Sequence, residues 1–154
     1  MIGDPYIPTP PGLVRAKLEF AEITGEDMVF DLGCGDARVL ILAAEEYDAE
    51  GVGAELQPSV AELAWSNVSD HQLEEQVEIR CEDYFETDLS EADLVVLYLT
   101  GRSLHAISEK LEEELKPGSR VVTHDFHLSG WEFSEQGEWE SPEGEPVKLF
   151  LYRR

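Results

Sequence analysis

Two patterns of hydrophobic and polar positions alternate along this chain. Short runs rich in apolar residues occur at residues 28–32, 51–55, 77–80, 92–99 and 120–124, and the run at 92–99 is the most continuous. Such runs predict β-strands, and a continuous one is typical of a central parallel strand buried on both faces. Between them, apolar residues recur every three or four positions, which predicts helices.

The predicted helices begin and end at recognisable signals. Thr9 and Pro10 are typical of an N-cap and a first helical residue, and the helix that they open is expected to end near Gly25. Its apolar face consists of Leu13, Val14, Leu18 and Ala21. Further helices are predicted around residues 39–44, at 58–67 and at 103–116.

The pattern changes after residue 124. Residues 126–140 are aromatic and polar without a helical period, and residues 147–152 alternate, which together predict an antiparallel β-hairpin. Repeated strand–helix alternation followed by a hairpin indicates an α/β fold: a doubly wound, Rossmann-like, mostly parallel sheet of seven strands. We expect one domain over residues 1–154.

Composition limits the class of protein. The chain has 154 residues, of which 42% are hydrophobic, so it is long and apolar enough to form a core rather than remain disordered. Its start lacks the basic and apolar regions of a signal peptide, and no apolar run could span a bilayer. Two cysteines, Cys34 and Cys81, are too few for a disulfide framework or a structural zinc site. We therefore expect a cytoplasmic protein without a metal site or a membrane partner.

The charge is strongly negative. Asp and Glu number 34 against 11 Lys and Arg, a formal net charge of −23, and the acids are spread along the chain. This charge disfavours binding to phosphate backbones. An even acidic coat is typical of proteins from salt-accumulating organisms, in which molar salt screens the repulsion; an ordinary acidic protein is the alternative.

The candidate ligand site follows the first strand. In doubly wound sheets, ligands bind beyond the carboxyl ends of the strands, and here Gly33 and Gly35 allow a tight turn at that point. A dinucleotide fingerprint would need glycine or alanine where this chain has Arg38. In addition, Asp31 would repel a pyrophosphate.

Acids at three successive strand ends suggest a different ligand. Asp31 can hold an ammonium group, Glu55 lies 20 residues after Gly35, where an acid can accept both hydroxyls of a ribose, and Asp83 can accept from an adenine amino group. Each acid alone could be a solvated loop carboxylate. A ligand with an ammonium, a ribose diol, an adenine and no pyrophosphate is S-adenosylmethionine.

The same residues carry a resemblance to a known family. The run Asp31-Leu32-Gly33-Cys34-Gly35-Asp36 is similar to the first motif of class I S-adenosylmethionine-dependent methyltransferases. Residues 6–10 (Tyr-Ile-Pro-Thr-Pro), 88–92, 115–118 and 123–126 resemble the small archaeal protein-lysine methyltransferases. These are related to the mitochondrial lysine methyltransferases that modify ATP synthase and the adenine nucleotide translocase. The resemblance covers essentially the whole chain and implies an archaeal enzyme that methylates protein lysines.

The resemblance also implies roles for individual residues. Residues 1–25 would form a lead segment and a helix over the cofactor, and Ala37 stands where the family usually has glycine. The implied cofactor-binding residues are Thr9, Asp31, Gly33, Cys34, Gly35, Glu55, Leu56, Asp83 and Tyr84.

The acceptor channel is expected at the end of the fourth strand. The predicted catalytic residues are Tyr98, as an orienting wall, Thr100 and Tyr6. His124, Asp125 and Phe126 would complete the rim, although His124 and Asp125 could equally be structural. The run Tyr98-Leu99-Thr100-Gly101 lacks the Asn-Pro-Pro-Tyr ending used on planar amino groups, which again disfavours nucleic-acid substrates.

We therefore expect a monomer that acts on lysine side chains of proteins. Two alternatives remain open from the sequence. One is a small-molecule or carboxyl methyltransferase on the same fold. The other is a non-catalytic module that binds S-adenosylmethionine.

Overall fold

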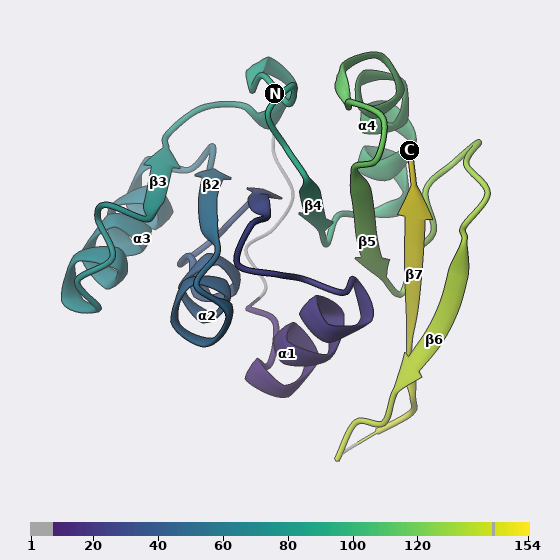
Figure 1. The fold of residues 1–154 in the computed structure, drawn as a ribbon, viewed down its shortest axis with the longest axis horizontal. Coiled ribbons are helices and arrows are strands. Elements are labelled where there is room, and N and C mark those ends of the chain that lie inside the picture. The colour runs from purple at the N-terminus through teal and green to yellow at the C-terminus, as the bar shows by residue number, and fades with distance from the viewer. Residues whose placement is uncertain (1–7, 143) are drawn as a thin grey trace.

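The protein folds around a seven-stranded sheet with the strand order β3-β2-β1-β4-β5-β7-β6 (Figure 1). The computed structural model describes residues 8–142 and 144–154. Strands β1 to β5 are parallel, whereas β7 pairs antiparallel with both β5 and β6, as the sequence predicted. The strands are β1 (Met28–Leu32), β2 (Glu50–Ala54), β3 (Val77–Arg80), β4 (Leu94–Leu97), β5 (Arg120–His124), β6 (Glu135–Trp139) and β7 (Val147–Arg153).

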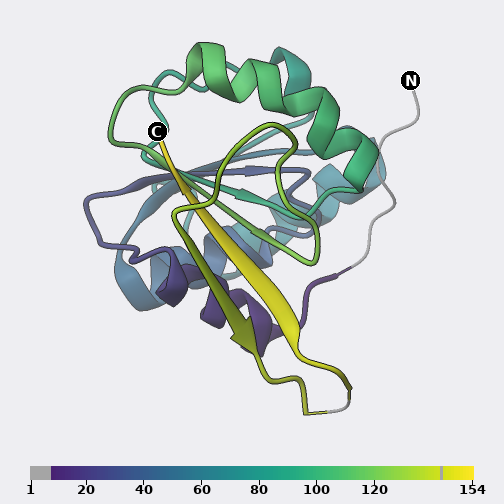
Figure 2. The same ribbon diagram turned by 90° about the vertical axis from the view of Figure 1, so that its right-hand side faces the viewer.

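Helices cover both faces of this sheet. Helices α1 (Pro11–Phe20), α2 (Arg38–Tyr47) and α3 (Pro58–Asp70) lie on one face, and α4 (Gly101–Glu114) lies on the other (Figure 2). A short 3-10 helix, η1 (Tyr84–Glu86), follows β3. Each face has its own buried cluster, because successive residues of a strand point to opposite sides. No helix in the described part of the chain is long and apolar enough to span a membrane.

The ends of α1 differ from the prediction. Pro10 rather than Thr9 is the N-cap, and Pro11 is the first helical residue. The helix ends at Phe20, five residues before Gly25, because Glu22 adopts a left-handed conformation with φ 58°. The backbone N–H of Ile23 then donates to the carbonyl of Leu18 and closes the helix. A glutamate rather than a glycine provides this turn, so the glycine signal was misleading.

Two glycines bring α2 close to the sheet. A Cβ atom on Gly51 would lie 2.6 Å from a methyl group of Leu40, and one on Gly53 would lie 2.7 Å from the Cys34 sulfur. Both positions therefore need glycine. The close packing holds the start of α2, and the loop before it, against the end of β2.

Candidate active site

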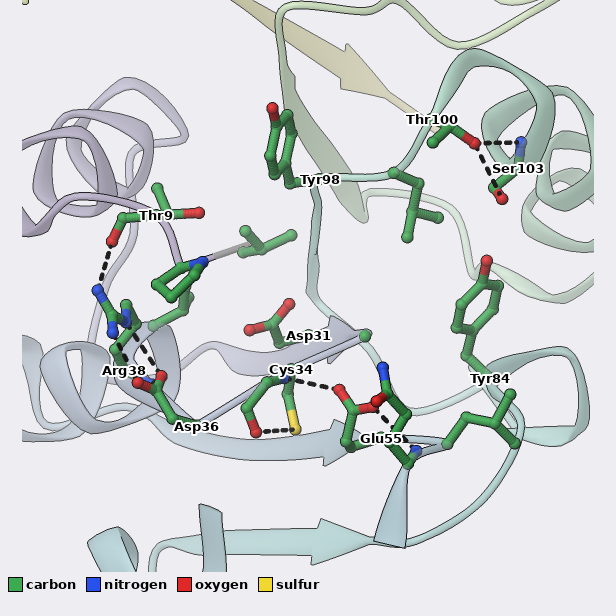
Figure 3. A pocket seen from close by; sticks show the side chains of 18 of the residues that line it. Thr9, Asp31, Cys34, Asp36, Arg38, Glu55, Tyr84, Tyr98, Thr100 and Ser103 are labelled. Atoms are coloured by element: carbon green, nitrogen blue, oxygen red, sulfur yellow. Dashed lines mark hydrogen bonds and ion pairs between the residues drawn. The ribbon is translucent and has the colours of Figure 1, made fainter. Parts of the chain in front are cut away.

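A cavity of about 630 Å³ opens at the carboxyl ends of the parallel strands (Figure 3). The loops after β1, β2, β3 and β4 line it, together with residues 8 and 9, α1 and Phe126. Tyr6 lies outside the described residues. Every other predicted site residue lines the cavity: Thr9, Asp31, Gly33, Cys34, Gly35, Glu55, Leu56, Asp83, Tyr84, Tyr98 and Thr100.

The loop after β1 forms the floor of the cavity through an unusual run of backbone conformations. Gly33, Gly35 and Ala37 have φ angles of 79°, 57° and 71°. Glycine adopts this region freely, whereas Ala37 is strained there, which explains why glycine suits position 37. The loop thereby exposes backbone atoms to the cavity.

Glu55 ties this loop to the end of β2. One carboxylate oxygen accepts from the backbone N–H of Gly35 at 3.0 Å, and the other accepts from that of Gln57 at 3.0 Å. Its side chain is only 7% exposed. A carboxylate oxygen can accept more than one hydrogen bond, so this fixed group can also receive two hydroxyls of a ribose.

Asp31, at the end of β1, points toward α1, which supplies Lys17. Asp31 is 6% exposed and Lys17 is 2% exposed. Burial raises the pKa of Asp31 to about 7, with Lys17 opposing the shift, and burial lowers the pKa of Lys17 to about 7, with Asp31 and Asp125 opposing it. The Lys17 ammonium also donates to the carbonyl of Leu97 at 2.9 Å. Burial disfavours the charge of each group, and each stabilises the charge of the other.

Tyr98, directly after β4, and His124, the last residue of β5, lie side by side. Their rings stack with centroids 3.8 Å apart and planes at 17°. The Tyr98 hydroxyl lies 3.5 Å from a carboxylate oxygen of Asp125, which has a left-handed backbone with φ 68°. Burial and Asp125 raise the pKa of Tyr98, so the phenol stays neutral.

His124 is buried behind Tyr98. Burial, and then the charge of Lys17, lower the pKa of His124 to about 2, so the ring is neutral. Its Nδ1 atom is buried without a hydrogen-bond partner among the described residues. The sequence had allowed a satisfied strand-end histidine, and this nitrogen departs from that expectation.

The opposite end of the cavity is formed by the loop after β3. Asp83 accepts from the backbone N–H of Phe85 at 3.0 Å and so begins η1. Tyr84 is buried and tilts against Phe85, with ring centroids 4.9 Å apart. These rings give this end an apolar lining suited to an adenine. Burial, and then the charge of Asp31, raise the pKa of Cys34 in the floor loop, so it remains a thiol.

The fit of the site to S-adenosylmethionine can be judged from the carboxylates that line the cavity. Two carboxylates, Asp31 and Glu55, are almost fully buried in one cavity, and the oxygens of each can accept further hydrogen bonds besides those from the protein. The cofactor offers an ammonium to the first and a ribose diol to the second. The residues therefore fit the cofactor.

Comparison with known proteins decides the family. The family described as ANTKMT methyltransferase domain matches residues 31–135, more than half of the chain. The chain belongs to this family.

Two individual relatives support the assignment of this methyltransferase to the family. It is 40% identical over 128 residues to a protein-lysine N-methyltransferase of Saccharolobus islandicus, covering 82% of this chain and 80% of that protein. It is 29% identical over 102 residues to the adenine nucleotide translocase lysine N-methyltransferase of Mus musculus, covering 66% of this chain and 44% of that protein.

A solved structure extends the likeness to the cofactor. An RNA methyltransferase from Salinibacter ruber, in complex with S-adenosyl-L-homocysteine, has a TM-score of 0.88 and 34% identity and covers 96% of this chain and 93% of that chain. The fold is therefore the class I methyltransferase fold, and the cofactor of this methyltransferase is S-adenosylmethionine.

Two residues of the methyltransferase site escaped the sequence analysis. Lys17 falls between Val14 and Leu18 on the apolar face of α1, so its position on that face was a signal that it is buried. The Arg38 guanidinium donates to the carbonyl of Thr9 at 2.9 Å and forms an ion pair with Asp36 at 2.6 Å. No local pattern in the sequence joins positions 9 and 38.

Proposed function

We propose that this methyltransferase transfers a methyl group to the ε-amino group of lysine residues in proteins. The observation that carries the proposal is that two aromatic residues, Tyr98 and Phe126, line the cavity that also holds Asp31. Phe126 is 46% exposed, so this aromatic lining reaches the surface, where a side chain of another protein can approach it. The relative at 40% identity, named a protein-lysine N-methyltransferase, supports the same acceptor.

The residues of the site are assigned roles on this basis. When bound, S-adenosylmethionine supplies an activated methyl group, so the protein mainly has to align the acceptor nitrogen. Asp31, with Gly33, Cys34 and Gly35, holds the methionine part, and Thr9 covers it. Glu55 and Leu56 hold the ribose, and Asp83 and Tyr84 flank the adenine.

The acceptor lysine must arrive as a neutral amine. Its ordinary pKa is about 10.4, and the partly dry channel beside Tyr98 lowers that pKa, because burial disfavours the ammonium. Tyr98 orients the alkyl chain, and Thr100 completes the channel. Asp125 lies near the Tyr98 hydroxyl at the rim, where it can receive the lysine before its proton is lost.

RNA is the second candidate acceptor, because the solved relative at 34% identity is named an RNA methyltransferase. The net charge of −23 argues against it, since contacts to phosphates need Lys and Arg. We further propose that the protein acts as a single domain over residues 1–154 and as a monomer, in the cytoplasm of a salt-accumulating archaeon.

The deciding experiment separates protein from RNA products. The purified enzyme is incubated in molar KCl with radiolabelled S-adenosylmethionine and a cell lysate, and the label is measured in the protein and RNA fractions. We expect the label in protein, and mass spectrometry should place added methyl groups on lysines. Label in RNA alone, or only in small molecules, would contradict the proposal, and Asp31→Asn serves as the control without transfer.

A further inference from the structure

Lys17 is a cation at the place where the enzyme receives a cationic cofactor. Its side chain lines the same cavity as Asp31 and Glu55, although it is 2% exposed. The ammonium donates a hydrogen bond to the Leu97 carbonyl, at the end of β4, which holds it inside the protein. The proposed methyl transfer gives this residue no role.

The charges around Lys17 come from every element packed against it. Asp31 on β1 and Asp125 after β5 stabilise its positive charge, and burial opposes it. His124 on β5 is kept neutral, and so is Tyr98 after β4, whose pKa is raised. The negative charges of two further carboxylates, Glu55 and Asp36, raise the pKa of Asp31. Asp31 and Lys17 are therefore the groups of this cluster that titrate near pH 7.

The cofactor and its product differ in charge at one atom. S-adenosylmethionine has a positive sulfonium, which joins its amino-acid part to the ribose, whereas S-adenosylhomocysteine has a neutral thioether there. Both have the ammonium that Asp31 would hold. The placement of that ammonium at Asp31 and of the ribose at Glu55 puts the sulfur between these two carboxylates, in the cavity that Lys17 lines.

We propose that Lys17 determines the preference of the site between cofactor and product: charged, it favours the neutral thioether, and uncharged, it favours the sulfonium. Two positive charges in a partly buried site repel each other enough to change a binding constant by roughly tenfold. Because the pair is buried, molar salt weakens this repulsion far less than it weakens repulsion at the surface. The proposal rests on the cofactor placement given above.

The test compares binding rather than turnover. The dissociation constants of S-adenosylmethionine and S-adenosylhomocysteine are measured by calorimetry in molar KCl at pH 6, 7 and 8. For the wild type, we expect the preference for S-adenosylmethionine to rise about tenfold from pH 6 to pH 8, as Lys17 loses its proton. Asp31 is ionised by the ammonium of either ligand, so its titration cancels in the ratio.

Two variants make the test specific. Lys17→Met should make the ratio nearly independent of pH, whereas Lys148→Met, the same change at an exposed position of β7, should leave it like that of the wild type. The ionisable groups of the free ligands titrate in the same way in all three experiments, so they contribute equally to the ratios of the three proteins. Circular dichroism verifies the fold of each variant.

The possible results separate this inference from the proposed function. A wild-type ratio that stays flat from pH 6 to pH 8 overturns the inference, whether or not Lys17→Met folds. A Lys17→Met ratio that still follows the wild-type ratio overturns it as well. The cofactor placement itself is wrong if neither ligand binds the wild type. It is also wrong if both ligands bind Asp31→Asn as tightly as they bind the wild type.

Discussion

At the scale of single residues, buried carboxylates distinguish this cavity from the acidic surface around it. The chain has 34 acids, and most of them face water, where one carboxylate more or less has little effect. Asp31 is 6% exposed and sits beside a buried ammonium. Its charge is therefore maintained by few partners, and the cofactor ammonium is expected to be one of them.

Replacing Asp31 by asparagine should abolish cofactor binding. The variant keeps the shape of the side chain but removes the charge that holds the ammonium. It also removes the carboxylate that contributes most to stabilising the charge of Lys17. We expect the affinity for S-adenosylmethionine to fall at least about 100-fold, as when one partner of a buried charge pair is lost. Calorimetry measures the loss. Asp48→Asn, the same change at the exposed end of α2, is the matched control, and equal affinities in both variants would contradict the assignment.

The neutral state of His124 predicts a pH-dependent stability. Its pKa is lowered to about 2 in the folded protein, against about 6.5 in the unfolded chain, so the unfolded state binds more protons between these values. Stability should therefore fall as the pH drops below about 6.5, by up to about 1.4 kcal/mol per pH unit from this residue.

His124→Phe tests this by keeping a ring against Tyr98 while removing the titrating nitrogens. Urea denaturation in molar KCl at pH 4.5, 5.5 and 6.5 should show a smaller loss of stability toward acid than in the wild type. His105→Phe, at an exposed position of α4, should retain the wild-type slope. An unchanged slope in His124→Phe would show that this histidine is not held neutral.

The sequence predicted the acids of the site better than its cations. Asp31, Glu55 and Asp83 each follow an apolar run, so their places at strand ends could be derived from local pattern. Lys17 lies on an apolar helix face, but the carboxylate that stabilises its charge, Asp31, comes from β1. No local pattern shows which strand end faces α1. The contact of Arg38 with Thr9 joins residues 29 positions apart and needs the tertiary fold.

At the scale of elements, Arg38 connects the start of α2 to the segment before α1. Its guanidinium forms an ion pair with Asp36 and donates to the Thr9 carbonyl. Thr9 lines the cavity, so this contact holds one wall of the cofactor site in place. An arginine can serve both partners at once because its donors form a rigid, planar fork.

Arg38→Met should therefore weaken cofactor binding without unfolding the protein. We expect the affinity for S-adenosylmethionine to fall about fivefold, as the segment at Thr9 must be ordered on binding, and the free energy of unfolding to change by less than about 1 kcal/mol. Hydrogen exchange at the amides of Thr9, Gly12 and Leu13 should become faster in the cofactor-free variant. Arg15→Met, which breaks the exposed ion pair between α1 and Glu46, should leave the affinity unchanged. If it lowers the affinity equally, the effect belongs to α1 as a whole.

The elements themselves were predictable, whereas their ends were less so. The five parallel strands follow from apolar runs joined by helices, and the hairpin of β6 and β7 follows from the change of pattern after residue 124. The strand order comes from the structure. The end of α1 was missed because Glu22 takes a conformation that glycine usually supplies. The fourth strand is shorter than its apolar run, since Ala92 and Leu99 are buried outside the sheet, before and after the strand.

At the scale of the whole molecule, the fold must tolerate a charge of −23. Many of the cations are already used in ion pairs within the described residues, among them Arg15, Arg38, Arg80, Lys110, Lys116, Arg120 and Arg153. The excess acids therefore face one another across the surface, and their repulsion opposes the compact state. At about 1 M salt the screening length is only about 3 Å, which removes most of that repulsion.

Thermal melting in KCl tests whether the protein depends on such salt. Between 0.1 M and 2 M KCl we expect the melting temperature to rise by about 10 °C, which for a chain of this length corresponds to about 3 kcal/mol. Sucrose at the same osmolality is the control, because it favours burial without screening charge and should raise the melting temperature less. A melting temperature that KCl leaves unchanged, or that sucrose raises equally, would mean that the acidic coat is not an adaptation to salt. The screened repulsion lies on the surface, so the binding preference set by the buried Lys17 should persist at both salt concentrations.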